Sequence, residues 1–215
     1  HPRITIGIPV YRGAALVGDV LQSIVAQTCG DFRVILSVDG GDHASATACR
    51  PFLADRRFAL TLQESQLGWA GNVNWLARQV DTEFFVYIGQ DDRFAPTFCR
   101  ATLDCADSNP QVGIVYSDVA WIGGKHGVMQ QPEKTGSPVA RMLAQLGDCL
   151  WLPFRGLRRT ALQRRIAELL VDDADSALED VIWVTRALQV TDVKRIAEPL
   201  GCKRFHSGMV TVGKG

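Results

Sequence analysis

The chain alternates short apolar runs with stretches whose apolar residues recur at helical spacing. This alternation constrains the fold more than any other feature. Apolar runs cover residues 4–10, 32–38, 58–62, 84–88 and 113–121, and helical patterns fall between most of them. Parallel strands need a long crossover connection, usually a helix. The sequence therefore predicts an α/β domain with a mainly parallel sheet flanked by helices.

The remaining elements are expected from the same periodicity. Helices are predicted over residues 17–24, 71–80, 96–107, 139–146, 160–170 and 176–188. Further strands are predicted over residues 149–154 and 190–199, and the tail after residue 201 shows no clear period. A chain of 215 residues suits one domain. That length buries roughly 70% of the surface of the unfolded chain, which is enough for a hydrophobic core.

Charge and composition exclude several classes of protein. Lys plus Arg and Asp plus Glu each number 23, so the formal net charge is zero and no basic surface for nucleic acid is expected. The apolar runs fall far short of the roughly 20 residues of a membrane span, and no leader peptide is expected before the first strand. The six cysteines show no zinc or disulfide spacing. We expect them to be reduced thiols of a cytoplasmic protein.

Two adjacent carboxylates, Asp91 and Asp92, follow the apolar run 84–88. In open α/β sheets, ligands bind at the edge where the strands end. Carboxylates fixed there can hold a hard cation such as Mg²⁺ or Mn²⁺, which can in turn hold a diphosphate. Alternatively, the pair only forms a turn before a helix that starts near Pro96.

The loops after the first two strands are expected at the same edge of the sheet. Asp39 can accept the imide N–H of a base such as uracil, and Tyr11 can stack on its ring. The alternative for Asp39 is a simple turn with the glycine that follows it. Pro9 lacks an N–H, so it is expected near the exit of the first strand or on an unpaired side.

Two asparagines lie at the predicted start of a helix. Asn72 and Asn74 follow Gly68, and only one of them is needed to cap that helix. The other would be free for a ligand.

A late helix carries the adjacent acids Glu179 and Asp180. Ser176, three residues before Glu179, has the spacing of a capping box, so Glu179 is expected mainly to cap the helix. Asp180 has no such role and adjoins the apolar stripe, so it is expected to point into the domain. The acids just before this helix are expected in a solvated loop: Asp172, Asp173 and Asp175.

Several cations and one histidine occur late in the chain. Arg155 and Arg158 are expected in a loop, where they can meet a phosphate or an acidic acceptor. Arg164 and Arg165 are more typical of a solvated helix face. His206 follows two cations and can serve a metal or a phosphate, although a lone histidine is more often structural or exposed.

Taken in order, six segments resemble the family 2 glycosyltransferases with the GT-A fold. The resemblance runs from residue 4 to about residue 208. Its segments are ITIGIPVYRG, LQSIVAQTCGDFRVILSVDGG, LGWAGNVNW, FFVYIGQDDRFAP, LEDVIWVTRAL and RFHSG. Each motif is weak alone, whereas six in this order are specific.

The resemblance implies a GT-A, Rossmann-like fold and an inverting glycosyltransferase. The donor would be a nucleotide-diphosphate sugar, with UDP-sugars favoured, and the acceptor a hydroxyl of a saccharide or a lipid-linked molecule. The setting would be cell-surface polysaccharide or glycolipid synthesis in the cytoplasm, with a peripheral place at the membrane left open. Within the single domain 1–215, residues 1–121 would bind the nucleotide sugar and residues 122–215 the acceptor.

The residue patterns and the resemblance together predict a role for each candidate residue. Asp180, with Glu179 beside it, would be catalytic, and Asp91 with His206 would hold Mg²⁺ or Mn²⁺. Arg155, Arg158 and His206 would face the diphosphate or the acceptor. The residues expected to bind the donor are Pro9, Tyr11, Asp39, Gly68, Asn74, Asp91 and Asp92.

One position departs from the family pattern. Gly89 stands where the family's Asp-x-Asp motif has its first Asp, and Asp91 matches the last. The sugar or ribose contact of the first Asp is therefore missing, so a non-catalytic nucleotide-sugar-binding domain is one alternative. A nucleotidyltransferase is another, but it normally has a Gly-rich basic loop after the first strand, where this chain has only Arg12 and Gly13.

Overall fold

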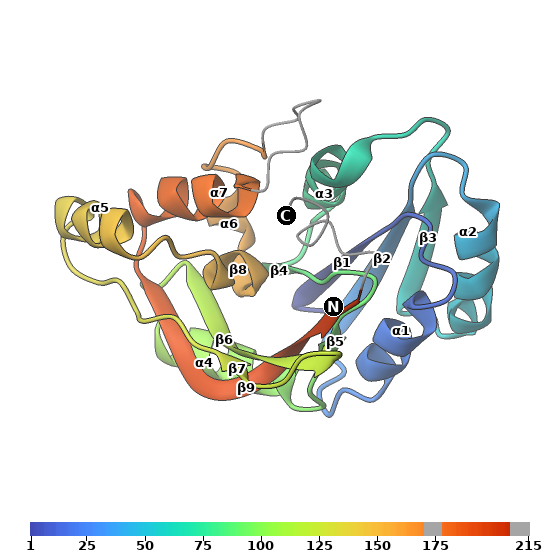
Figure 1. Ribbon diagram of the computed structural model, residues 1–215, viewed down its shortest axis with the longest axis horizontal. Coiled ribbons are helices and arrows are strands. Elements are labelled where there is room, and N and C mark those ends of the chain that lie inside the picture. Colours follow the sequence, from blue (N-terminus) through green and yellow to red (C-terminus); the bar gives the residue numbers. More distant parts are fainter. Residues whose placement is uncertain (170–177, 207–215) are drawn as a thin grey trace.

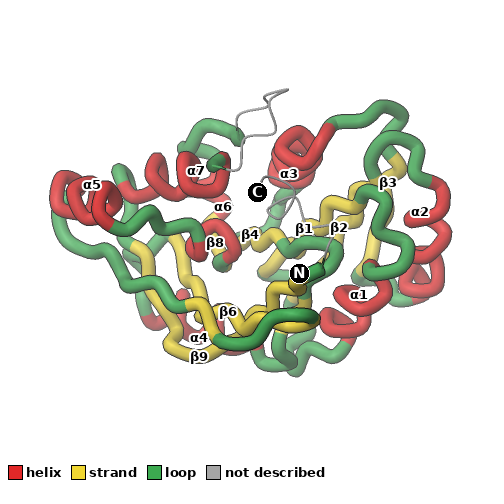
Figure 2. The backbone as a smooth tube through the Cα atoms, in the orientation of Figure 1, coloured by secondary structure: helices red, strands yellow, loops and turns green. Residues whose placement is uncertain are grey.

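A sheet of nine strands forms the centre of the molecule in this computed structural model, which describes residues 1–169 and 178–206. Helices lie on both sides of the sheet (Figures 1 and 2). The strands are β1 (Ile4–Val10), β2 (Phe32–Val38), β3 (Phe58–Leu62), β4 (Phe84–Tyr87), β5 (Arg93–Phe94), β6 (Ile114–Gly123), β7 (Val128–Met129), β8 (Leu157–Arg159) and β9 (Val193–Phe205).

The α-helices match most of the expected positions. They are α1 (Val17–Val25), α2 (His43–Cys49), α3 (Gly68–Arg78), α4 (Phe98–Ser108), α5 (Pro138–Gly147), α6 (Thr160–Gln163) and α7 (Glu179–Leu188). Two 3₁₀ turns complete the described elements, η1 (Arg50–Ala54) and η2 (Leu152–Arg155). No helix among the described residues combines the length and the hydropathy needed to cross a bilayer.

The order of the strands in the sheet is β3-β2-β1-β4-β8-β6-β9-β5, and β7 pairs with β6. β1 is parallel to β2 and β4, and β2 is parallel to β3. β8 runs antiparallel to both of its neighbours, β4 and β6. The expected parallel sheet is therefore present in the first half of the chain, and the second half adds a mixed part.

Two hydrophobic clusters form the core, one on each face of the sheet. β4 shows why its sequence is apolar without alternation: Phe84 and Val86 join one cluster, and Phe85 and Tyr87 join the other. The first cluster includes side chains of α1 and α4, and the second those of α3 and α7. Figure 1 shows α1 and α2 on one side of β1, β2 and β3, with α3 on the other.

The topology brings several loops to one edge of the sheet. Because β1, β2 and β4 are parallel and in register, the loops that follow them leave the sheet on the same side. β9 reaches this edge from the other half of the chain, where Gly201 and Cys202 pair with β5 directly after the Asp91–Asp92 turn. The two halves of the chain therefore meet at the candidate site.

Three expectations about the second half are wrong. The strand expected over residues 149–154 is the 3₁₀ turn η2, because Pro153 has no N–H for a sheet and stands in the first turn of this helix. The strand instead follows as β8. The last strand is longer than expected and includes much of the tail, and the helix expected over residues 160–170 stops at Gln163.

The six cysteines are free thiols, as the spacing predicted. Cys29, Cys49 and Cys99 are buried. Burial raises the pKa of Cys99 to about 12 and that of Cys49 to about 11. Cys49 and Cys99 therefore stay protonated at neutral pH and act as small apolar side chains in the core.

Candidate active site

The turn after β4 gathers charged groups from three parts of the chain. Asp91 Oδ2 lies 2.9 Å from Nε2 of His206, and both side chains are partly exposed. Asp92 is only 2% exposed. Its Oδ2 accepts a hydrogen bond from Nη1 of Arg155 at 2.6 Å, and its Oδ1 accepts the backbone N–H of Arg204 at 3.0 Å. The structure thus brings Asp91, Asp92, Arg155 and His206 together.

Arg204 fixes this turn against two other elements, a role that no pattern in the sequence predicts. Its Nε donates to the carbonyl of Asp91 at 3.0 Å, and its Nη2 pairs with Asp19 of α1 at 2.7 Å. Its backbone also bonds Asp92, so one residue of β9 holds both acids of the turn. The two consecutive cations before His206 were the signal in the sequence, but only the pairing of β9 shows which group each one reaches.

The carboxylates of Asp91 and Asp92 lie close to the place where a side chain at Gly89 would begin. A Cβ at this position would lie 2.9 Å from Asp92 Oδ2 and 3.0 Å from Asp91 Oδ1. Both approaches are closer than carbon normally tolerates. The space in which a first motif Asp would begin is therefore occupied by the carboxylates of Asp91 and Asp92.

The pair Asp91–His206 fits a hard divalent cation that is shared with a substrate. Among residues 1–169 and 178–206, no three His, Cys, Asp or Glu side chains are grouped so that they could hold a metal. Mg²⁺ usually takes only one or two protein carboxylates and completes its coordination with water and substrate phosphates. One carboxylate and one imidazole, both partly exposed, suit such a site and do not form an all-protein cage.

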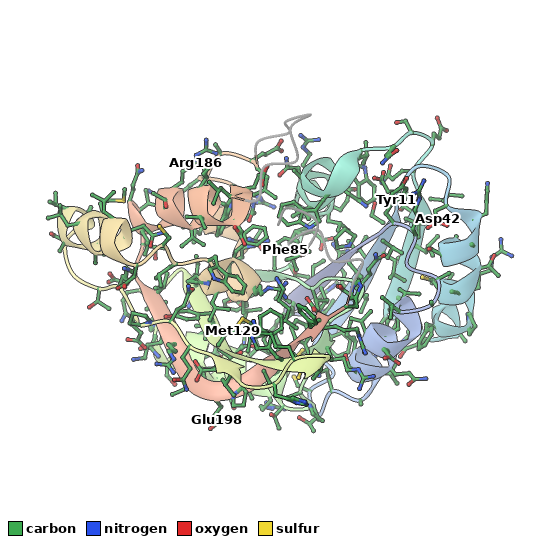
Figure 3. All side chains as sticks on the ribbon, in the orientation of Figure 1. Tyr11, Asp42, Phe85, Met129, Arg186 and Glu198 are labelled. Atoms are coloured by element: carbon green, nitrogen blue, oxygen red, sulfur yellow. The ribbon has the colours of Figure 1, made fainter. Side chains whose placement is uncertain are left out.

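The loop after β1 is held rigidly beside this turn. Tyr11 exchanges two hydrogen bonds with the side chain of Gln90, both at 2.9 Å. Arg12 takes a left-handed backbone conformation, with φ of 50°, and its N–H donates to Oδ2 of Asp42 at 2.6 Å. Its guanidinium lies 5.1 Å from the centroid of the Tyr11 ring. Tyr11 and Asp42 lie close together in Figure 3.

Asp39 anchors the start of α3. The side chain is 1% exposed, and its two oxygens accept the backbone N–H groups of Leu67 at 2.7 Å and Gly68 at 2.9 Å. Gly68 has φ of 70°, a conformation that favours glycine. A carboxylate has further lone pairs, so these bonds leave the predicted contact with a base open. Pro9 is buried near the exit of β1, where the register places it beside Ser37 of β2 and beyond the last β1–β4 pair at Gly7.

We expect Asp39→Ala to lower the free energy of unfolding, since the partly buried N–H groups of Leu67 and Gly68 lose their acceptors. Each such loss costs about 1–3 kcal/mol. Urea denaturation of the variant measures the change, with Asp31→Ala as the control because Asp31 is exposed. If Asp39→Ala unfolds at the same urea concentration as the control, the anchoring role is wrong.

The asparagines of α3 do not act as expected. α3 begins at Gly68, so neither Asn72 nor Asn74 caps it. The amide of Asn74 donates to the carbonyl of Leu169 and accepts its N–H, each at 2.9 Å, and the residue is 4% exposed. Asn74 therefore ties α3 to the backbone of Leu169, and its contact with the donor stays a prediction.

The position predicted for Arg158 is also wrong. It lies in β8 and not in a loop, it is 1% exposed, and its Nε and Nη1 have no hydrogen-bond partner in the part of the chain that the structure describes. Its guanidinium is packed among the rings of Phe85, Phe154 and Trp183, at 4.6, 5.0 and 4.6 Å from their centroids. Burial lowers the pKa of Arg158 to about 9, so the group stays charged at neutral pH. It cannot contact a phosphate from this position.

Asp180 lies in the first turn of α7, close enough to Arg155 and Lys203 for their charges to act on its carboxyl. Burial raises the pKa of its carboxyl, and the charge of Glu179 adds to this, whereas a backbone hydrogen bond from Val181 and the charges of Arg155 and Lys203 oppose it. Oδ1 accepts that N–H at 2.8 Å. A carboxylate with a raised pKa is a stronger base than an exposed one. The shared influence of Arg155 links Asp180 to the Asp91–Asp92 turn.

Glu179 does not occupy the position that a capping box requires. α7 begins at Glu179, with Leu178 at the N-cap, whereas a capping box with Ser176 would place Glu179 at the third helical position. Ser176 and the acids 172–175 lie outside the described residues. Glu179 is 6% exposed and is one of the buried residues at the N-terminal end of α7.

Similarity to known proteins agrees with this geometry. The family model described as glycosyl transferase family 2 matches residues 5–168, which is most of the chain. The chain belongs to glycosyl transferase family 2. A curated relative, an uncharacterized glycosyltransferase of Haemophilus influenzae, is 27% identical over 115 residues, covering 53% of this chain and 37% of that protein.

Two solved structures show the same fold at low sequence identity. Residues 1–349 of S. aureus TarS in complex with UDP-GlcNAc match 99% of this chain and 61% of that one, with a TM-score of 0.81 and 15% identity. Mannosyltransferase PcManGT of Pyrobaculum calidifontis, in complex with GDP-Man and Mn²⁺, matches 97% of this chain and 58% of that one, with a TM-score of 0.72 and 14% identity. The GT-A fold is confirmed, and this chain spans less than two thirds of each of these relatives.

Proposed function

We propose that the chain transfers a sugar from a nucleotide-diphosphate sugar, with UDP-sugars favoured, to an acceptor hydroxyl with inversion. One observation carries the proposal: Asp180, a half-buried carboxylate with a raised pKa, lies close enough to Arg155 and Lys203 for their charges to act on it, and the charge of Asp91, which pairs with His206, acts on the same two cations. A base and a phosphate-directed cation site are the two parts that such a transfer requires. Membership of glycosyl transferase family 2 supports the same reaction.

Different residues would bind the donor, hold the cation and accept the proton. Asp39 and Tyr11 would hold the base of the donor, and Asp91 with His206 would hold Mg²⁺ or Mn²⁺. When bound, the cation supplies positive charge to the leaving diphosphate. Asp180 would take the proton of the acceptor hydroxyl as that oxygen attacks the anomeric carbon. A single displacement from the opposite face inverts the configuration there, as in inverting glycosidases.

The bonds made and broken balance without a further reactant. The acceptor oxygen forms the new glycosidic bond, the bond between the anomeric carbon and the phosphate oxygen breaks, and Asp180 keeps the proton until it is released to solvent. Residues 1–121 would bind the donor and residues 122–215 the acceptor. A saccharide or lipid-linked acceptor of cell-surface polysaccharide or glycolipid synthesis in the cytoplasm follows from the family resemblance.

Donor binding without catalysis is the second candidate function. Gly89 favours it, since the first acid of the family motif is missing and the carboxylates of Asp91 and Asp92 fill the space beside it. Both candidates require a nucleotide site. They differ only in whether bound donor is turned over.

A thermal-shift screen of UDP- and GDP-sugars, with and without Mn²⁺, tests the shared part of the proposal. A ligand at a hundred times its dissociation constant stabilises the folded state by about 2.7 kcal/mol. We expect at least one UDP-sugar to raise the melting temperature in Mn²⁺ and to lose most of that effect in EDTA. If no nucleotide sugar raises the melting temperature with Mn²⁺ present, both candidate functions are wrong.

A further inference from the structure

Lys203 of β9 is a half-buried cation for which the reaction described above has no use. Within residues 1–169 and 178–206, no carboxylate hydrogen-bonds or ion-pairs with its ammonium group. Its Nζ lies 5.1 Å from the centroid of the Trp151 ring. Burial, followed by the charge of Arg155, lowers the pKa of Lys203 to about 8, so the group is still largely charged at neutral pH.

Arg155 places a second cation beside the same ring. Its Cζ lies 5.8 Å from the centroid of Trp151, and its Nη1 is the donor to Asp92. Asp92 is the only carboxylate among the described residues that pairs directly with either cation, so the ammonium of Lys203 has no direct ionic partner there, although the charges of Asp91, Asp92 and Asp180 act on it. Holding two like charges together in a partly buried place is unfavourable unless an anion joins them.

The direction of Lys203 separates it from the proposed metal site. Successive side chains of a strand point to opposite faces. Arg204, the next residue, reaches Asp19 of α1, so Lys203 points to the opposite face, towards Trp151. The charge of Asp180 acts on Lys203 from the start of α7. Lys203 therefore lies on the side from which the acceptor hydroxyl would approach Asp180.

We propose that Lys203 and Arg155 form a subsite for a negatively charged group, a carboxylate or a phosphate, carried by the acceptor. The inference rests on the proposed function, because it assumes that the acceptor approaches from the side of Asp180. An anion between the two cations would make charge-assisted hydrogen bonds to both. The acceptor would then be an acidic saccharide or a phosphorylated one, and a neutral sugar would leave the two cations unpaired.

Direct binding of small sugars tests the subsite. Ligand-observed NMR titrations would compare methyl glucuronide and glucose 6-phosphate with the neutral methyl glucoside. We expect at least one of the two acidic sugars to bind the native protein about tenfold more tightly than the neutral one, as a charge-assisted hydrogen bond implies. Lys203→Met should abolish this preference, and Lys203→Arg should retain most of it.

Lys125 offers a matched control. It is exposed, and its Nζ also lies over a tryptophan ring, 4.2 Å from the centroid of Trp121. Lys125→Met should keep the preference for the acidic sugar. Thermal melts of both variants separate a local effect from unfolding, and recovery in Lys203→Arg shows that the charge matters.

Three results would overturn the subsite: equal or absent binding of acidic and neutral sugars by the native protein, an unchanged preference in Lys203→Met, or the same loss in Lys125→Met. A fourth concerns the source of the anion. If Lys203→Met weakens the binding of UDP with Mn²⁺, Lys203 serves the donor diphosphate and not the acceptor. Absence of UDP binding by the native protein would instead refute the proposed function. The sugar titrations do not depend on UDP, so they test the subsite separately.

Discussion

Asp180→Asn is expected to lower the rate of sugar transfer by about a hundred- to ten-thousand-fold, the usual effect of losing a general base. Asn keeps the shape of the side chain and cannot take the proton of the acceptor. Binding of UDP with Mn²⁺ should be nearly unchanged, since the base acts on the acceptor. Steady-state rates and nucleotide titrations of the same variant measure the two effects separately.

The raised pKa of Asp180 adds a pH dependence to this prediction. The native rate should rise with pH as Asp180 ionises, with a midpoint above the value of about 3.9 for an exposed Asp. A carboxyl with a raised folded-state pKa stabilises the fold in its protonated form, and this stability is lost as the pH rises through that pKa. Asp180→Asn should therefore melt no lower than the native protein at neutral pH.

Glu179→Gln is the matched control, one residue away in the same turn. Gln keeps the shape and the acceptor oxygen, so we expect little loss of transfer. If Glu179→Gln stops transfer while Asp180→Asn retains it, the two roles are exchanged. If neither variant reduces turnover, the base lies elsewhere, and the acids 172–175 are the next residues to test.

Asp91→Ala is expected to remove the Mn²⁺-dependent part of nucleotide binding. The native protein should gain about 2.7 kcal/mol from a nucleotide at a hundred times its dissociation constant. The variant should gain much less in Mn²⁺ at the same concentration, because His206 alone provides one ligand and no charge to the cation. Thermal shifts with and without Mn²⁺ measure the difference.

Asp31→Ala is a suitable control for Asp91→Ala, since it removes an exposed carboxylate from the other end of the strands. It should keep the full Mn²⁺-dependent shift. A full shift in Asp91→Ala would place the cation elsewhere, even if nucleotide binding itself is confirmed.

The first half of the fold could be predicted closely because its signals are local. β1, β2 and β3 have the predicted bounds, since each is an apolar run followed by turn or polar residues. The apolar strand before Asp91 is also correct to within one residue. The glycines around Gly68 weaken the helical pattern, so α3 was expected three residues too late. The bonds of Asp39 to the start of α3 are long-range and invisible in the sequence.

The second half was harder to predict, because its elements depend on pairing across the chain. β9 alternates poorly, since its polar residues reach partners on both faces: Arg204 bonds Asp91 and Asp19, and Lys203 lies over Trp151. The sequence predicts a loop position for Arg158 because a charged residue is rarely buried. Its aromatic surroundings come from β4, η2 and α7, and no local pattern predicts that three separate elements enclose one guanidinium.

Release of nucleoside diphosphate from a bound nucleotide sugar is the direct test of transferase activity. The measurement would follow the diphosphate over time, using the donor chosen by the thermal-shift screen, Mn²⁺ and either water or an acidic saccharide as acceptor. We predict release by the native protein, faster with the acceptor, and a large decrease in Asp180→Asn at equal donor occupancy. Saturating donor binding with no release by the native protein, in water or with any acceptor tested, would contradict the assignment as a transferase and indicate a nucleotide-sugar-binding domain.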